Sequence, residues 1–289
     1  MTLIVLGSAN RDYTVVVERH PLPGETVLGG SVVTGTGGKG ANQAAAAARA
    51  GAKPVFVGAV GDDSTGADIL ADLEAAGVDV SRVARSKEPS GIALITVSHD
   101  GENTIVVAAG ANGSLEPEST GQLVATLADA ETVLLAQLEI PVAVVAAAAD
   151  VVAHAGGRFV LNLSPSVSVP SRMLGLADPL IVNETEGSDL AGSRIENAPD
   201  AEVVARRLLA SSRSVVITLG GDGVVVADAN GIVHLPSERV TVVDTTGAGD
   251  AFAGALAASL AAGATLRDAA KAGIAAGAAA VQHMGAQRQ

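Results

Sequence analysis

Short apolar runs of strand length recur along the chain and alternate with longer helical stretches. The apolar runs lie at 3–7, 55–60, 132–136, 159–163, 180–183 and 215–219. The helical stretches lie at 39–50, 64–76, 117–129, 141–154, 200–211, 250–262 and 267–281. Short apolar strands that alternate with helices are typical of parallel βαβ units. The pattern therefore predicts an α/β fold, with helices on both faces of a mostly parallel sheet and ligands at the carboxyl ends of its strands.

Other strand-like runs follow one another without helices. They lie at 13–18, 27–35, 91–98 and 103–109, and HDGEN (99–103) and DANG (228–231) resemble hairpin turns. We expect the four runs to form a small antiparallel sheet that acts as a lid beside the ligand site. Its spare apolar face would suit a dimer contact. The prediction is one α/β domain over 1–289, with lid strands inserted at about 13–35 and 91–109.

Composition narrows the class of protein. Hydrophobic residues make up 48% of the 289 residues, aromatic residues only 1%, and the net charge is −13. Such an acidic chain is unsuited to nucleic acid. Cysteine is absent, which excludes disulfides and thiolate zinc sites, and the histidines show no metal-binding spacing. The sequence shows no signal peptide and no membrane span, so we expect a soluble cytoplasmic protein.

The stretch DTTGAGD contains the first candidate site. The apolar run before it ends at Asp244, a glycine turn follows, and a helix begins near Asp250. Glycines let backbone N–H groups converge at a helix N-terminus, which forms a cradle for an anion. The helix N-terminus should also keep Asp250 ionised. From this segment alone, an ordinary helix cap explains the aspartate equally well.

The stretch GTGGKGANQ, at 35–43, contains the second candidate site. Gly35, Gly37 and Gly40 form a G-x-G-x-x-G pattern, with Asp62 about twenty residues further on. This pattern suggests a nicotinamide-dependent dehydrogenase. The motif does not follow the first core strand, however, which weakens that interpretation. The alternative is close backbone approach to a small polyol, with donors on Lys39 and Asn42.

Polar side chains also follow several core strands. Asn10 and Asp12 are two residues apart, so both can face the same side and bind adjacent hydroxyls, although an Asx turn explains them as well. Glu139 follows the run 132–136 and is a further hydroxyl contact or a helix-start acid.

NETE (183–186) and TLGGDG (218–223) follow the runs 180–183 and 215–219. Asn183 and Glu186 could organise a hydrated Mg²⁺ and its phosphates, or simply begin a helix. Gly220, Gly221 and Gly223 would let the backbone approach a nucleotide.

Together, GGKGANQ, NETE, TLG and DTTGAGDAF, in this order, resemble the ribokinase-like (PfkB) family of carbohydrate kinases. The resemblance covers almost the whole chain. It implies the family's three-layer α/β/α sandwich with a small antiparallel lid, and a dimer joined through the lid sheets. It also implies ATP-dependent phosphorylation of a primary hydroxyl on a small sugar. D-Ribose is the expected sugar, and fructose, ketodeoxygluconate or a nucleoside are alternatives within the family.

The resemblance also assigns roles to residues. Asp250 is implied as catalytic base, with Gly247, Ala248 and Gly249 as the anion hole. The implied sugar contacts are Asn10, Asp12, Gly38, Lys39, Asn42, Glu139 and Asp250. The implied nucleotide contacts are Asn183, Thr218, Gly220, Gly223, Gly249 and Ile274. Glu186 would serve Mg²⁺ through water. The implied site for monovalent K⁺ comprises Asp244, Thr246, Ala280, His283 and Gly285, and Gln289 falls where a serine often completes it.

Two other classes of function stay open at this point. One is the dehydrogenase built on GTGGKG, and the other is a non-catalytic nucleotide-binding regulator. The intact Asp250 and its glycine turn argue against the regulator, and the position of GTGGKG argues against the dehydrogenase.

Overall fold

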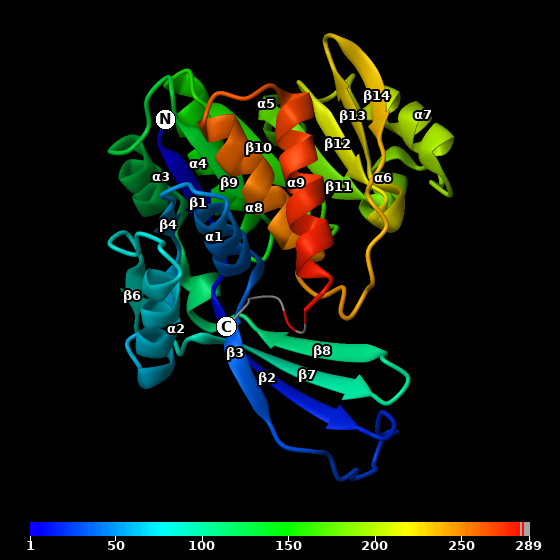
Figure 1. Ribbon diagram of the computed structural model, residues 1–289. Coiled ribbons are helices and arrows are strands. Elements are labelled where there is room, and N and C mark those ends of the chain that lie inside the picture. The colour runs from blue at the N-terminus through cyan, green and yellow to red at the C-terminus, as the bar shows by residue number, and fades with distance from the viewer. Residues whose placement is uncertain (284, 286–289) are drawn as a thin grey trace.

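The computed structural model describes residues 1–283 and residue 285, and within them the largest element is an eight-stranded sheet (Figure 1). Its strands are β1 (Leu3–Leu6), β4 (Val55–Val57), β9 (Val133–Ala136), β10 (Arg158–Asn162), β11 (Ala177–Asn183), β12 (Val215–Thr218), β13 (Val224–Asp228) and β14 (Gly231–Leu235). Their spatial order is β14-β13-β12-β11-β10-β9-β1-β4. From β4 to β12 all neighbours run parallel, and β13 and β14 add an antiparallel hairpin. The predicted mostly parallel sheet is confirmed.

Helices cover both faces of this sheet. One face packs against α1 (Lys39–Arg49), α2 (Ser64–Ala75), α8 (Ala248–Ala261) and α9 (Leu266–Ala280). The other packs against α3 (Pro117–Ala125), α4 (Val142–His154), α5 (Ser171–Leu176), α6 (Glu184–Ala191) and α7 (Ala198–Leu208). Strand residues alternate between the two cores, so Ile4 and Leu6 face the second group while Leu3 and Val5 face the first. The predicted three-layer sandwich is therefore present.

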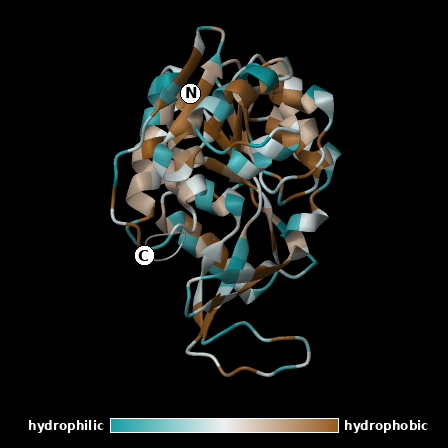
Figure 2. Cartoon of the chain, turned by 90° about the vertical axis from the view of Figure 1, so that its right-hand side faces the viewer, coloured by the Kyte–Doolittle hydropathy of each residue, from teal (hydrophilic) through white to brown (hydrophobic). Residues whose placement is uncertain are grey.

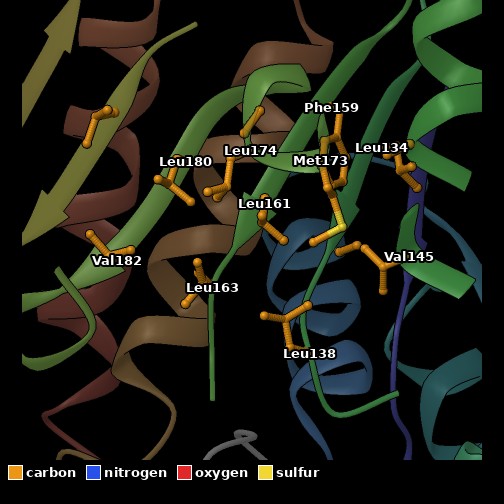
Figure 3. Close-up of a cluster of buried hydrophobic side chains, with 14 of the residues drawn as sticks. Leu134, Leu138, Val145, Phe159, Leu161, Leu163, Met173, Leu174, Leu180 and Val182 are labelled. Carbon is orange, nitrogen blue, oxygen red and sulfur yellow. The ribbon is translucent and has the colours of Figure 1, made fainter. Parts of the chain in front are cut away.

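The core is built from aliphatic side chains, with phenylalanine at a few places. Figure 3 shows the core on the α4 and α5 side, where Phe159 and Leu161 from β10 lie near Met173 from α5 and Val145 from α4. All four side chains are buried. Close-packed Ala, Val and Leu thus provide the rigid platform that the strand ends need in order to position a site.

A second, smaller sheet projects from the main sheet (Figures 1 and 2). We call it the small sheet, and it comprises β2 (Asn10–Val17), β3 (Val33–Gly37), β7 (Gly91–Ser98) and β8 (Asn103–Ala108) in the order β3-β2-β7-β8. The β2–β3 and β7–β8 pairs are antiparallel, as expected for hairpins. The central β2–β7 pair runs parallel. This happens because β2 and β7 both start at the main sheet, where Asn10 pairs with Gly91, and both run outward from it.

Two apolar runs are used differently from the prediction. The run at 55–60 divides at Gly58, because β5 (Ala59–Gly61) pairs with β6 (Ala84–Ser86) and not with the main sheet. The run at 27–35 contributes a regular strand only from Val33 onward. Short helical turns, η1 (Gly110–Ser114) and η2 (Gly220–Asp222), complete the secondary structure of the described chain. Among those residues, no helix combines the length and apolar character that crossing a bilayer requires.

Candidate active site

Asp250 lies in the first turn of α8, where the glycine turn opens onto the helix. Gly247 immediately precedes the helix with φ of 76°, a left-handed conformation that glycine adopts readily. No atom lies within 4 Å of the position that a Cβ on Gly249 would take. The Asp250 side chain itself is buried, with only 8% of the residue exposed. A buried carboxylate requires hydrogen-bond partners, which identify the groups around it.

The partners of Asp250 come from α1, more than two hundred positions earlier in the chain. Asn42 Nδ2 donates to Oδ2 at 3.1 Å, and Gln43 Nε2 donates to Oδ1 at 2.9 Å. The helices approach closely because Gly254, one turn beyond Asp250, has no side chain. A Cβ there would lie 2.4 Å from the Gln43 carbonyl oxygen and 2.7 Å from the Ala46 Cβ. The two glycine-rich segments of the sequence therefore meet at one place.

Burial raises the pKa of Asp250 above that of an ordinary aspartate. The positive charge of Lys39 and the hydrogen bonds from Gln43 and Asn42 lower it only in part, and the negative charge of Glu139 raises it further. The expected effect of the helix N-terminus is to favour the ionised form, whereas desolvation acts in the opposite direction and determines the direction of the net pKa shift. A carboxylate with a raised pKa is a stronger base, which suits proton abstraction near neutral pH.

The loop after β1 lies directly against the start of α1. Gly38 has φ of 88°, and a Cβ on it would lie 3.0 Å from the Ser8 carbonyl oxygen. A Cβ on Gly40 would lie 2.6 Å from the carbonyl carbon of Gly7. The glycines of GGKG thus allow two backbone segments to pack without side chains between them. This gives the motif a close-approach role and brings GSAN beside Lys39.

Glu139, which follows β9, connects these segments. Its Oε2 accepts hydrogen bonds from Ser8 Oγ at 2.6 Å and from the Lys39 backbone N–H at 3.0 Å. Its charge also acts on both Asp12 and Asp250. The predicted contact at Glu139 is therefore part of the same cluster.

Asn10 and Asp12 lie two residues apart on β2, beside this cluster. Asn10 Oδ1 accepts a hydrogen bond from Asn112 Nδ2 at 2.8 Å. Asp12 Oδ1 is buried and has no hydrogen-bond partner within the described chain. Burial, followed by the charge of Glu139, raises the pKa of Asp12 to about 7; the Arg11 charge opposes this shift, and Asp250 adds to it. Asp12 is thus a buried acceptor without a donor, beside the candidate base.

The predicted nucleotide contacts lie further along the same sheet edge. Asn183 and Thr218 are paired in register at the ends of β11 and β12. Asn183 and Glu186 form a capping box for α6, with the Glu186 N–H donating to Asn183 Oδ1 at 2.8 Å and the Asn183 N–H donating to Glu186 Oε2 at 2.9 Å. The helix-start interpretation of NETE is therefore correct. It leaves Glu186 Oε1 outside the capping box.

The two glycines predicted to contact nucleotide differ in their surroundings. No atom lies within 4 Å of a Cβ position on Gly220. A Cβ on Gly223 would lie 2.1 Å from the Leu235 carbonyl oxygen, and Gly223 has φ of 93°. The turn between β12 and β13 therefore requires glycine at 223, while Gly220 faces open space. Ile274, on α9, is half-buried.

The chain is similar to known proteins over most of its length. The model of the pfkB family carbohydrate kinases matches residues 2–289. The chain belongs to this family. It is 36% identical over 288 residues to a ribokinase of Haemophilus influenzae, covering 99% of this chain and 94% of the relative. It is also 36% identical over 261 residues to a ribokinase of Staphylococcus aureus, covering 89% and 86%. The structure of Arabidopsis thaliana ribokinase complexed with ribose and ATP matches with a TM-score of 0.88 and 30% identity, over 98% of this chain and 93% of that one.

Family membership explains the G-x-G-x-x-G pattern, so the dehydrogenase interpretation is not needed. Gly35 and Gly37 lie in β3 of the small sheet and not at the end of a main-sheet strand. A dinucleotide fingerprint would require the opposite placement. As a member of the PfkB family, the chain is a phosphotransferase that acts on a sugar hydroxyl.

The predicted site for a monovalent cation lies around Asp244, at the start of the glycine turn. Asp244 Oδ1 accepts from the Thr246 N–H at 2.9 Å, and Oδ2 accepts from the Gly285 N–H at 2.8 Å. Burial raises the pKa of Asp244, but these hydrogen bonds lower it more, so the net shift is downward. An ionised carboxylate is an oxygen donor of the kind that a hard cation prefers. The carbonyl of Ala280 accepts from the His283 N–H at 3.2 Å, and Gln289 lies outside the described residues.

No group of three or more metal-ligating side chains gathers within the described residues. Two surface hollows lie away from the cluster around Asp250. One, of about 540 Å³, is lined by α3 and α4 residues including His154. The other, of about 330 Å³, is lined by residues including Arg82 and Arg85.

Sequence reasoning missed several residues that the structure adds to the cluster. Ser8, Gln43 and Asn112 form hydrogen bonds with the predicted residues Glu139, Asp250 and Asn10, and Asn162 accepts a hydrogen bond from Gln43. Ser8 and Gln43 lie near predicted residues in the sequence and Asn162 ends a core strand, whereas Asn112 has no such signal.

Proposed function

We propose that this chain is an ATP-dependent ribokinase that converts D-ribose to D-ribose 5-phosphate. One observation supports this most strongly. Asp250, at the start of α8, is buried against Asn42 and Gln43 of α1, and its pKa is affected by the charges of Lys39 and Glu139. A base at a helix N-terminus beside hydroxyl-binding groups is what transfer of a phosphoryl group to a sugar requires.

In the proposed reaction, Asp250 aligns the primary hydroxyl of ribose and accepts its proton. The O5–P bond forms as the bond between the γ-phosphorus and the β,γ-bridging oxygen breaks, and ADP leaves. The backbone around Gly247, Ala248 and Gly249 faces the transferring phosphoryl group. The Ala248 N–H already donates to the Thr245 carbonyl oxygen at 3.2 Å. The N–H groups of Gly247 and Gly249 would therefore be the main donors that stabilise the negative charge of the phosphoryl group.

The sugar is held on the other side by Asn10, Asp12, Gly38, Lys39 and Glu139. A ribose hydroxyl that donates to Asp12 Oδ1 would satisfy an acceptor that is buried and unpartnered. Such a bond also favours the ionised form of Asp12. The site therefore favours a ligand with several hydroxyl groups that donate hydrogen bonds.

ATP is assigned to the edge formed by Asn183, Thr218, Gly220, Gly223 and Ile274. Mg²⁺ would be held through water by Glu186, and it would neutralise charge on the triphosphate. K⁺ would be held by Asp244, Thr246 and the carbonyls of Ala280, His283 and Gly285. Both ions are part of the proposal.

We also propose a homodimer joined through the small sheet. The strand registers place four exposed apolar residues on one face of this sheet: Val16 at 55%, Val33 at 63%, Ile105 at 50% and Val107 at 50%. Leu94 at 51% and Val106 at 61% lie on the other face. An exposed apolar patch of this kind is typical of an interface. A cytoplasmic location follows from the supply of ATP there.

The test is sugar-dependent ADP formation with pentoses, hexoses and nucleosides, in buffer with K⁺ and Mg²⁺. We expect ribose to give the highest kcat/KM and ribose 5-phosphate to be the product. A preference for a hexose or a nucleoside would indicate a different substrate within the same family of kinases. No sugar-dependent ADP release with any member of the panel would indicate a non-catalytic protein.

A further inference from the structure

A line of buried amide side chains leads from the main sheet to Asp250. Gln137, just after β9, donates from Nε2 to Gln43 Oε1 at 2.7 Å. Gln43 Nε2 donates to Asp250 Oδ1 and to Asn162 Oδ1, both at 2.9 Å. Gln43 and Gln137 are fully buried. None of these amides is explained by the sugar and nucleotide contacts above.

The chemistry of the groups fixes the direction of every hydrogen bond in this line. An ionised carboxylate can only accept, so Gln43 must present its NH₂ group to Asp250. Its carbonyl then faces Gln137, which must donate. Both N–H groups of the Gln43 amide are used, one by Asp250 and the other by Asn162. Gln43 therefore has one satisfied orientation, and Gln137 helps to select it.

The backbone makes room for this line of amides. A Cβ on Gly7 would lie 1.9 Å from Gln137 Oε1, so the side chain of Gln137 occupies space that only glycine at position 7 leaves. Asn162, at the end of β10, is buried as well. The amides are thus held by two strands of the rigid main sheet, and they reach Asp250 through α1.

From this arrangement we infer that Gln43 is a positioning residue for the catalytic base, with its orientation set by Gln137. Gln43 holds Oδ1 of Asp250 from the buried side. Oδ2, which also accepts from Asn42, is left as the oxygen that takes the proton of the sugar hydroxyl. The inference depends on the proposed function, in which Asp250 is the base.

The hydrogen bond from Gln43 also favours the ionised form of Asp250. The hydrogen bonds from Gln43 and Asn42 oppose the effect of burial on the pKa of Asp250. The charged groups that act on Asp250 are Lys39 from α1, Glu139 after β9 and Asp12 from β2. Removing Gln43 leaves all three in place, so the resulting change in pKa reports the amide alone.

The experiment compares Gln43→Leu with the wild type at saturating ribose and ATP over a range of pH. We expect kcat to fall roughly 10- to 100-fold, as for loss of a hydrogen bond to a charged group, and KM for either substrate to change by less than about threefold. We also expect the acid limb of the kcat–pH profile to move to higher pH. Ser214→Ala is the matched control, because it removes a part-buried hydrogen bond to Asp178 at the far, amino end of β12. It should leave the pH profile unchanged.

Asp250→Asn separates this inference from the proposed function. In that background Gln43→Leu should lower kcat by less than about threefold more, since the two residues act as a unit. If Asp250→Asn keeps wild-type turnover, the proposed base is wrong and the inference falls with it. If Asp250→Asn is inactive while Gln43→Leu keeps the wild-type pH profile, or the two losses multiply, the inference alone is overturned.

Gln137→Met gives the same test if Gln43→Leu does not fold. It leaves every hydrogen bond to Asp250 in place and removes only the donor that orients Gln43. We expect a smaller loss of kcat than for Gln43→Leu, with a shift of the acid limb in the same direction. An unchanged profile in a folded Gln137→Met variant would contradict the role of Gln137 and, where Gln43→Leu does not fold, the inference as a whole.

Discussion

Asp12 is predicted to lower the stability of the free protein at neutral pH. Its pKa is raised to about 7 by burial and by the charge of Glu139, and one of its oxygens has no partner within the described chain. In the unfolded chain an aspartate titrates near pH 4. The folded state therefore holds a proton on Asp12 between about pH 4 and pH 7 that the unfolded state has lost. The contribution of Asp12 to the free energy of unfolding therefore falls as pH rises through that window, and it is constant above it.

The magnitude follows from the size of the shift. The folded pKa of about 7 is roughly 1.5 pH units above pH 5.5. Each of these units lowers the free energy of unfolding by about 1.4 kcal/mol. The wild type should therefore lose about 2 kcal/mol relative to Asp12→Asn between about pH 5.5 and pH 8. Asparagine keeps the shape of the side chain but cannot ionise, so any constant effect of the substitution cancels from this difference.

Urea unfolding at several pH values measures the effect. As pH rises from about 5.5 to 8, the free energy of unfolding of Asp12→Asn should increase by about 2 kcal/mol relative to that of the wild type. The variant should also use ribose less well than the wild type does. The shift of Asp12 would be refuted by a free-energy difference between the two proteins that does not change with pH.

Three further predictions follow. Asp12→Ala should lower kcat/KM for ribose by about 2–3 kcal/mol and leave KM for ATP unchanged; a selective rise in KM for ATP would reverse the assignment. Turnover should be higher in K⁺ than in Na⁺, and Asp244→Ala should remove the difference; equal rates of the wild type in both salts would exclude the cation site. Gly40→Ala should destabilise the protein by about 1–3 kcal/mol in thermal unfolding, because the new Cβ meets backbone of Gly7, whereas Gly35→Ala, with open space around its Cβ, should not. Equal melting temperatures of the two variants would contradict the close packing of the loops.

The layered fold could be predicted because its elements have strong local patterns. Predicted helices at 39–50 and 64–76 correspond to α1 and α2, and the apolar runs at 132–136 and 215–219 contain β9 and β12. The division of the run at 55–60 could not be read in the same way. Its residues are apolar throughout, and only tertiary pairing with β6 distinguishes β5 from β4.

The site was predictable where a motif fixes the backbone. Asp250 and Lys39 belong to glycine-rich segments whose turns require glycine, and the structure brings them together. Gln43 was not predicted, because along α1 it is one polar residue before an alanine run. Whether it faces solvent or Asp250 depends on how closely α8 packs, which is decided by Gly254, over two hundred residues away.

The role of Asp250 is tested by measuring turnover and ATP binding of Asp250→Asn on the same preparation. We expect kcat to fall by roughly 10²–10⁴ while ATP binds with wild-type affinity, because only the group that takes the hydroxyl proton is lost. Near-wild-type turnover in this variant would show that the buried aspartate at the start of α8 is not the catalytic base.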